Sequence, residues 1–219
     1  MTSPFRLAII AALLAPLLAA CGVNTIPTYE ESARAAWAQV QNQYQRRADL
    51  IPNLVESVQA YADQEREVLV AVTEARASAT QANVTVDPTN QASIAQYAEA
   101  QGALSSALGR LLVVSERYPE LRSNQNFLAL QSQLEGTENR IAIARRDYIE
   151  AVRVYNTELK TFPGRLWAST LYSGNEPLVP FEASAENQTA PRVDFDRPGE
   201  AVGAPANENA PAGRDAVAN

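Results

Sequence analysis

The chain has 219 residues, of which 46 % are hydrophobic, 20 % are charged and 7 % are aromatic. This balance is typical of one globular domain with appendages, and the frequent alanine and glutamine favour helix over sheet. The formal net charge of -7 argues against a nucleic-acid partner, because phosphate binding needs a basic face, and against docking on anionic lipid through charge alone.

The first twenty residues differ from the rest of the chain. Arg6 is their only charged side chain, and an apolar run from Leu7 to Ala20 is interrupted only by Pro16. As a helix this run would rise about 21 Å, which is short of the ~30 Å hydrocarbon core of a membrane. A charged start, a short apolar stretch and small residues at its end are typical of an export signal.

The string LAACG at residues 18–22 refines this prediction, because it matches a bacterial lipoprotein signal. Small residues there give a peptidase access to the backbone before a Cys whose thiol carries diacylglycerol. Cys21 is the only cysteine in the chain, so it cannot form an internal disulfide. We predict a signal peptide at 1–20 and lipid attachment at Cys21. Without cleavage, the segment would instead be a single-pass, transmembrane-like N-terminal helix.

After a tether at 21–28, a first helix is predicted from Tyr29 to Gln81. Its stripe alternates steps of three and four residues, the spacing of coiled-coil packing, and only Arg47 and Glu65 interrupt its apolar character. Pro52 predicts a bend. The stripe keeps its phase across the proline, which favours one kinked helix over two separate ones.

A second helix is predicted from Gln91 to Glu116. Residues 82–90 before it form a predicted loop, with Asn90 as the N-cap. The alternative is a single β-strand over 83–86. Gly102 and Gly109 weaken the helix, and we interpret them as points of close approach to a neighbouring helix. The string Arg117-Tyr118-Pro119 ends this segment, because the residue before a proline avoids helical angles.

A third helix is predicted from a cap at Ser123 or Asn124 to about Thr161, where Phe162-Pro163-Gly164 stops it. A short amphipathic piece at 165–172 is expected to fold back on the bundle through Leu166, Trp167 and Leu171. Residues 183–219 are rich in Ala, Pro, Asn and Glu and are predicted to be a disordered tail. The predicted fold is therefore all-α, an elongated antiparallel bundle of three to four long helices over 29–182.

Several long strings in the chain resemble the LemA family of bacterial membrane-associated proteins. They are DLIPNLV at 49–55, ERYPELR at 116–122, ENRIAIARRDY at 138–148 and YNTELKTFP at 155–163. The resemblance implies a helical bundle held outside the cytoplasmic membrane by an N-terminal segment, with no general enzymatic activity. The chain departs from the family in its lipobox, which would replace the usual transmembrane segment, and at Gln64, where members often have His.

The inventory of reactive groups argues against an enzyme. The chain has no histidine, which removes Ser-His-Asp and Cys-His catalysis and the common zinc ligands. Lys160 is the only lysine, and its place near a helix end favours an interaction with the helix dipole over a catalytic role. Glycines are scattered, so phosphate-cradling loops are absent. We expect no catalytic residue, no cofactor and no metal site.

Charged residues on the predicted seams are the main candidates for a functional cluster. They are Arg47, Glu65, Glu138 and Arg145, with Arg146 beside the last. Because buried charges are costly unless paired, cross-helix ion pairs are expected. We favour the interpretation that such pairs fix the register of a long bundle. The alternative is a polar pocket for a ligand.

The predicted function is that of a non-enzymatic interaction or scaffold protein on the extracytoplasmic side of a bacterial membrane. Its partners would be the membrane, through lipid at Cys21 or the apolar segment, and an unidentified envelope protein. The alternative is a module that binds a ligand or envelope polymer through the polar seam residues. Apolar residues at 167–172 and 178–181 either cap the end of the bundle or form a docking surface.

Overall fold

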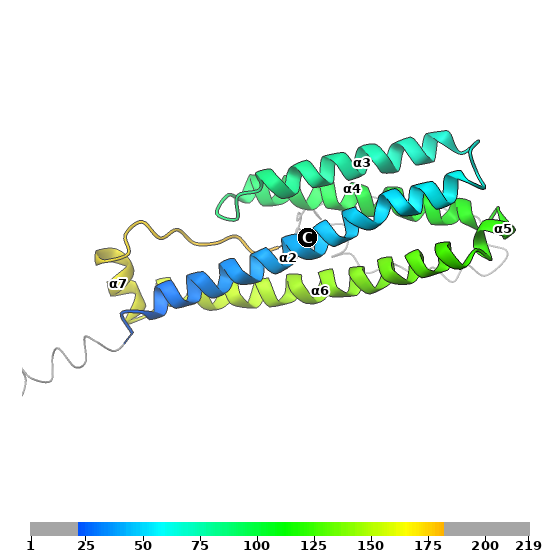
Figure 1. Ribbon diagram of the computed structural model, residues 1–219. Helices are drawn as coiled ribbons and strands as arrows, with labels where there is room; N and C mark the ends of the chain where they lie inside the picture. The colour runs from blue at the N-terminus through cyan, green and yellow to red at the C-terminus, as the bar shows by residue number, and fades with distance from the viewer. Residues whose placement is uncertain (1–21, 182–219) are drawn as a thin grey trace, which may run out of the picture. The chain divides into compact units, whose positions relative to one another are not determined.

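The computed structural model describes residues 22–181, which contain six helices and no strand (Figure 1). The all-α prediction is thereby confirmed. The predicted signal peptide, Cys21 and the predicted tail at 183–219 lie outside the described residues.

The two longest helices, α2 (Thr25–Gln59) and α6 (Gln125–Lys160), run antiparallel along each other (Figure 1). The 35 residues of α2 span about 52 Å. This helix begins four residues before the predicted start at Tyr29, so residues 25–28 are helical and do not belong to a tether. Pro27 is tolerated because it falls in the first turn, where the backbone N–H has no helical partner.

The prediction of one kinked helix from Tyr29 to Gln81 was wrong. The helix ends at Gln59, and α3 (Arg66–Thr85) returns beside it, while Pro52 lies inside α2 without interrupting it. The turn at 60–65 lets Leu69 and Val72 of α3 join the same core as Ile51. A continuous helix would have carried these side chains past the end of the bundle. A short turn preserves the three-four spacing, and the spacing alone therefore does not distinguish one helix from two.

The second predicted helix is confirmed as α4 (Gln91–Ser115). The Asn90 side chain accepts hydrogen bonds from the backbone N–H groups of Ala92 and Ser93 at 2.9 and 3.2 Å, as an N-cap does. The loop is shorter than predicted, because α3 continues to Thr85, which also excludes the alternative β-strand. The interpretation of Gly102 and Gly109 was wrong, since a Cβ at either position would meet no atom within 4 Å.

The connection between α4 and α6 contains the short helix α5 (Pro119–Arg122), with Pro119 in its first turn. Asn124 caps α6 by accepting from the N–H groups of Asn126 and Phe127. After α6, the short helix α7 (Gly164–Thr170) turns back toward the bundle. Of the three residues predicted to hold it there, only Trp167 packs on the core, whereas Leu166 and Leu171 are exposed.

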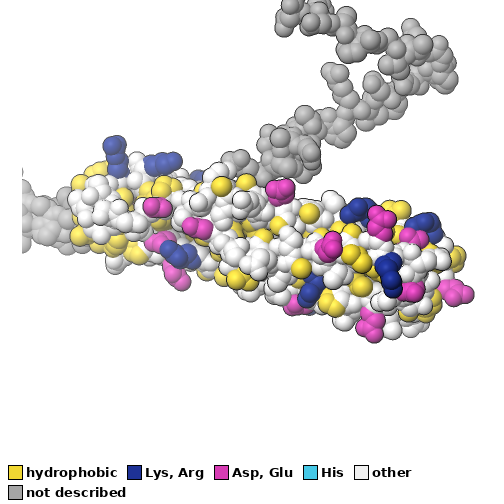
Figure 2. All heavy atoms as spheres, turned by 90° about the horizontal axis from the view of Figure 1, so that it is seen from above, with side chains coloured by type: hydrophobic (Ala, Val, Ile, Leu, Met, Phe, Trp, Pro, Cys, Tyr) yellow, Lys and Arg dark blue, Asp and Glu magenta, His cyan; other side chains and the backbone are white. Residues whose placement is uncertain are grey.

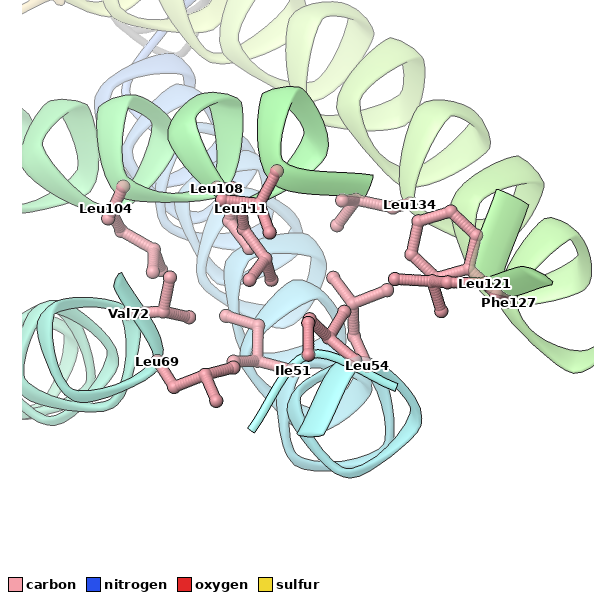
Figure 3. Packing of buried hydrophobic residues seen from close by; sticks show 14 of the residues in the cluster. Ile51, Leu54, Leu69, Val72, Leu104, Leu108, Leu111, Leu121, Phe127 and Leu134 are labelled. Carbon is pink, nitrogen blue, oxygen red and sulfur yellow. The ribbon is translucent and has the colours of Figure 1, made fainter. Parts of the chain in front are cut away.

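The core consists of two clusters along the bundle. Leucines and other aliphatic side chains of α2, α3 and α4 meet Leu121 and Phe127 in the first cluster (Figure 3). Aromatic residues dominate the second, in which Trp37, Tyr97 and Tyr148 pack together with Phe181. Phe181 ends an extended segment, residues 175–181, that follows α7 and the turns after it and buries Leu178 as well. Residues 178–181 are therefore largely covered and do not form a free docking surface.

Candidate functional site

Arg47 is the central residue of the predicted seam cluster, which the structure assembles only in part. Its side chain on α2 is 1 % exposed. Nη1 donates to the Glu138 carboxylate of α6 at 2.8 Å and to Oγ of Ser105 at 2.9 Å. Nη2 donates to the side-chain and backbone oxygens of Gln101 at 2.6 and 3.2 Å. Both terminal nitrogens of the guanidinium are therefore occupied within the bundle.

Gln101 extends this network to a fourth helix. Its amide oxygen accepts from Arg47, and its Nε2 donates to the backbone oxygen of Ala79 on α3 at 3.1 Å. Gln101 is itself 4 % exposed. One guanidinium thus connects α2, α4 and α6 directly and α3 through Gln101. Because each bond requires a particular axial position of its helix, the network fixes the register of all four helices.

The surroundings of the network leave little space for a ligand. The void beside Gln101, bordered by Tyr44, Ala48 and Thr80, does not admit a water-sized sphere. The ring of Tyr44 lies 4.9 Å from the Arg47 guanidinium carbon, close enough for a cation–π contact. Burial raises the pKa of Tyr44, an effect that the charges of Arg145 and Arg47 oppose. The arrangement therefore favours the register interpretation over a ligand pocket.

The other two residues of the predicted cluster lie elsewhere. Glu65, in the turn between α2 and α3, pairs with Arg117 at 3.0 Å and accepts a hydrogen bond from the Tyr118 hydroxyl at 3.1 Å. The guanidinium of Arg145 lies 4.8 Å from the ring centre of Phe181. Arg146 is on the surface and is 3.5 Å from Asp147. Only Arg47 and Glu138 of the predicted cluster therefore meet.

Sequence reasoning missed Gln101 and Ser105 as partners of Arg47. A signal for Gln101 was present, because it occupies the step between Tyr97 and Leu104 in the stripe of α4. A polar residue at a buried stripe position is a candidate partner for a charge on a facing helix. Ser105 lies one turn later on the same helix and gave no comparable signal.

Asn156 of α6 holds the extended segment that follows α7, and sequence reasoning missed it too. Its Nδ2 donates to the Leu178 backbone oxygen at 2.7 Å, and its Oδ1 accepts from the Leu178 N–H at 3.0 Å. Tyr148 adds a bond from its hydroxyl to the Val179 oxygen at 2.9 Å. These contacts bind the backbone of the segment and keep Phe181 against Trp37, with ring centres 5.5 Å apart.

The described residues contain no group of three or more acidic, His or Cys side chains arranged to hold a metal ion. Among the same residues, none of the helices combines the length and apolarity needed to span a membrane. Shallow grooves do follow the surface, one of them between α2 and α6 with Gln43, Arg140 and Ile143 among its lining residues.

Comparison with known proteins gives one family match and several curated relatives. The model of the LemA family matches residues 36–195, which is more than half of the chain. Magnetosome protein MamQ 2 and magnetosome protein MamQ 1 of Paramagnetospirillum magneticum are each 39 % identical over 64 residues, covering 29 % of this chain and 24 % of theirs. Magnetosome protein MamQ of Magnetospirillum gryphiswaldense is 31 % identical over the same lengths. The matched segment thus spans about a quarter of these relatives.

Proposed function

The chain belongs to the LemA family, and from this premise we propose that it is a membrane-anchored, extracytoplasmic bundle protein of the bacterial envelope. Its role is that of a non-enzymatic interaction or scaffold protein. The anchor is lipid on Cys21, or the apolar segment before it if that segment remains uncleaved. The association with magnetosomes in the names of the relatives does not enter the proposal, because the shared segment covers 24 % of those proteins.

The main support for the scaffold role is that the terminal nitrogens of Arg47 make their contacts inside the bundle. Its charge is paired with Glu138 and its remaining terminal donors bind Ser105 and Gln101, all within the bundle. A guanidinium held in this way supports a fixed arrangement of helices. The one hydroxyl that binds it, on Ser105, donates to the backbone oxygen of Gln101 at 3.1 Å and not to the Glu138 carboxylate, so these two groups lack the hydrogen bond that would activate a nucleophile.

The alternative, a module that binds a ligand or envelope polymer through the seam charges, has less support. Its motivating residues are either paired with one another or separated, as Glu65 and Arg145 are from Arg47. Loss of a bound envelope polymer on Glu138→Gln substitution, with the fold intact, would restore this alternative.

The location is tested by adding a protease to intact cells, to cells with a permeabilised outer membrane, and to spheroplasts. We expect the membrane-retained chain to be degraded in at least one of these preparations while a cytoplasmic marker survives. Survival of the chain in all three, followed by degradation after lysis of the inner membrane, would place it on the cytoplasmic side and contradict the proposal.

The interaction role is tested by cross-linking at the exposed surface of the bundle in intact cells. Photoreactive residues are introduced at exposed positions of two helices, such as Val113 on α4 and Leu128 on α6. We expect discrete cross-linked species that depend on the position. If every position on the two helices yields only uncross-linked protein, the scaffold role is wrong.

A further inference from the structure

The first described residues of the chain are fastened to the turn between α6 and α7. The hydroxyl of Thr25 lies 2.6 Å from the Gly22 carbonyl oxygen and 2.7 Å from the Glu158 carboxylate of α6. Gly22 has a φ of 94°, in the region that favours glycine, and a Cβ there would lie 3.3 Å from the ring of Pro163. We call residues 22–25 and 158–167 the N-terminal corner.

The turn inside this corner is tight. A Cβ at Gly164 would collide with the backbone oxygen of Glu158, so only glycine fits between α6 and α7. Trp167 packs against the second core cluster and thereby attaches α7 to the bundle. The corner is therefore a fixed part of the bundle, and its surface has a defined direction relative to α2 and α6.

Three large apolar side chains project from this turn and helix into solvent. Phe162 is 86 % exposed, Leu171 is 63 % exposed and Leu166 is 49 % exposed. We call these three residues the apolar rim. Two basic residues, Lys160 and Arg165, are exposed on the same stretch, and neither forms an ion pair within residues 22–181. Hydrophobic and basic side chains are both visible at the α7 end of the bundle in Figure 2.

The sequence that directly precedes Gly22 indicates what the apolar rim contacts. Gly22 is bonded to Cys21, and the apolar run of residues 7–20 precedes it directly. One residue spans at most about 3.6 Å. Under the proposed anchor, whether lipid on Cys21 or the run itself is held by the membrane, the N-terminal corner is therefore placed beside the bilayer.

We propose that the apolar rim is a second membrane contact, in which Phe162, Leu166 and Leu171 enter the interfacial layer of the bilayer. Lys160 and Arg165 then lie at the level of the lipid phosphates, as cations beside an apolar surface do at membrane interfaces. This proposal rests on the proposed membrane anchor and adds a second contact to it. One tether alone would leave the bundle free to swivel, whereas two contacts fix its orientation on the membrane.

The net charge of the chain sets which side chains provide the attraction. At -7, the protein as a whole is repelled by anionic lipid. The apolar side chains of the rim therefore provide the attraction, and the two local cations reduce the repulsion near the membrane. Binding through the rim without the anchor is expected to be weak.

The test uses the full chain in vesicles of phosphatidylethanolamine and phosphatidylglycerol whose acyl chains carry bromine, a short-range quencher of tryptophan. The two tryptophans give a matched pair of variants. Trp37→Phe leaves only Trp167, in the N-terminal corner, and Trp167→Phe leaves only Trp37, twelve residues and about 18 Å along α2 from Thr25. We expect loss of fluorescence from Trp167 and none from Trp37.

A second comparison keeps both tryptophans. Replacing the rim with Phe162→Ser, Leu166→Ser and Leu171→Ser should abolish the quenching. The control, Val84→Ser with Val113→Ser, removes exposed apolar side chains elsewhere and should leave it unchanged. These surface changes do not depend on how well the core accepts Trp37→Phe.

The outcomes separate the two proposals. If the chain floats with the vesicles but Trp167 is not quenched, the rim contact is wrong and the anchor stands. The same conclusion holds if the rim variant is quenched as strongly as the control variant. If the chain does not float with the vesicles at all, both the anchor and the rim contact are wrong.

Discussion

Arg47 shows how a charge is accommodated inside this bundle. Four hydrogen bonds, one of which is also the ion pair with Glu138, compensate the two terminal nitrogens of the guanidinium for the loss of water, whereas Nε is buried without a hydrogen-bond partner among the described residues. The sequence predicted that Arg47 would need a partner, because it interrupts an apolar stripe, and it correctly included Glu138. It wrongly included Glu65 and Arg145. Periodicity shows on which face of a helix a residue lies, but it does not show which residue of a facing helix lies at the same position along the bundle axis.

The pair between Arg47 and Glu138 is best tested by a double-mutant cycle. Glu138→Leu leaves a buried cation without its partner, and Arg47→Met leaves Gln101 with an unpaired oxygen. We expect each to lower the free energy of unfolding by about 2–3 kcal/mol, at or below the lower end of the range for a broken buried pair, because Glu138 is half-exposed. The double variant should lose less than the sum, with a coupling of about 1 kcal/mol or more.

Urea denaturation measures these values, and Arg46→Met is the matched control. Arg46 is the neighbouring residue of α2 and is exposed, so its loss should change the free energy of unfolding by no more than about 0.5 kcal/mol. Strictly additive effects of Arg47→Met and Glu138→Leu would show that the ion pair contributes nothing.

Gly102 and Gly109 lie in exposed positions of α4 with open space where a Cβ would be. Alanine restricts the unfolded chain and suits a helix, so Gly102→Ala and Gly109→Ala should each raise the free energy of unfolding by about 0.5–1 kcal/mol. Gly164→Ala should lower it instead, because its Cβ would collide with the Glu158 backbone oxygen. A destabilised Gly102→Ala in thermal denaturation would mean that the glycine has a packing role after all.

At the scale of elements, local signals predicted helix ends well where side chains bind the backbone. Asn90 and Asn124 cap α4 and α6 as predicted, and α4 ends at Ser115, just before the string Arg117-Tyr118-Pro119 that was expected to end it; the short helix α5 was not predicted. The turn at 60–65 has neither Pro nor Gly, so nothing local separated α2 from α3. The chain turns there because the turn allows Leu69 and Val72 to be buried. Which residues become buried depends on how the whole bundle packs, and a local pattern does not show it.

The extended segment after α7 had no periodicity to predict it, and its attachment depends on single side chains of α6. Asn156→Ala removes both bonds to the Leu178 backbone. We expect faster hydrogen exchange at the Leu178 amide and a red shift in Trp37 fluorescence as Phe181 leaves its ring. Thr157→Ala, at the adjacent exposed position of α6, should leave both signals as they are. Unchanged exchange at Leu178 in Asn156→Ala would show that the apolar contacts alone hold the segment.

At the scale of the whole molecule, the second core cluster sets the response to alkaline pH. Burial raises the pKa of Tyr44, Tyr97, Tyr148 and Tyr155 above the ordinary value of 10.0. The unfolded chain therefore releases tyrosine protons at a lower pH than the folded chain, and stability present below pH ~10 is lost as pH rises further.

Urea denaturation between pH 8 and about 11 measures this loss. We expect the free energy of unfolding to fall above the ordinary tyrosine pKa, and to fall less steeply in Tyr97→Phe. The same slope in Tyr97→Phe and the unsubstituted chain would contradict a contribution from Tyr97.

The sequence predicted the fold and the family of the whole molecule more fully than its site. Long helical stripes and the strings shared with the LemA family extend over most of the chain, so many residues support the same prediction. The network around Arg47 depends on a few side chains from four helices, and no local pattern specifies their meeting. The N-terminal corner was missed for the same reason, since residues 22–25 and 158–167 are far apart in sequence.

The central claim is that the N-terminus holds this bundle on a membrane through Cys21. Membrane fractionation and the intact mass of the native protein, compared with a Cys21→Ala variant, test it most directly. We predict a mature chain that begins at Cys21 and carries acyl chains, and an unprocessed, unacylated variant. An unprocessed native chain that Cys21→Ala leaves equally membrane-bound would contradict lipid attachment, and a native chain found only in soluble fractions would contradict the anchor altogether.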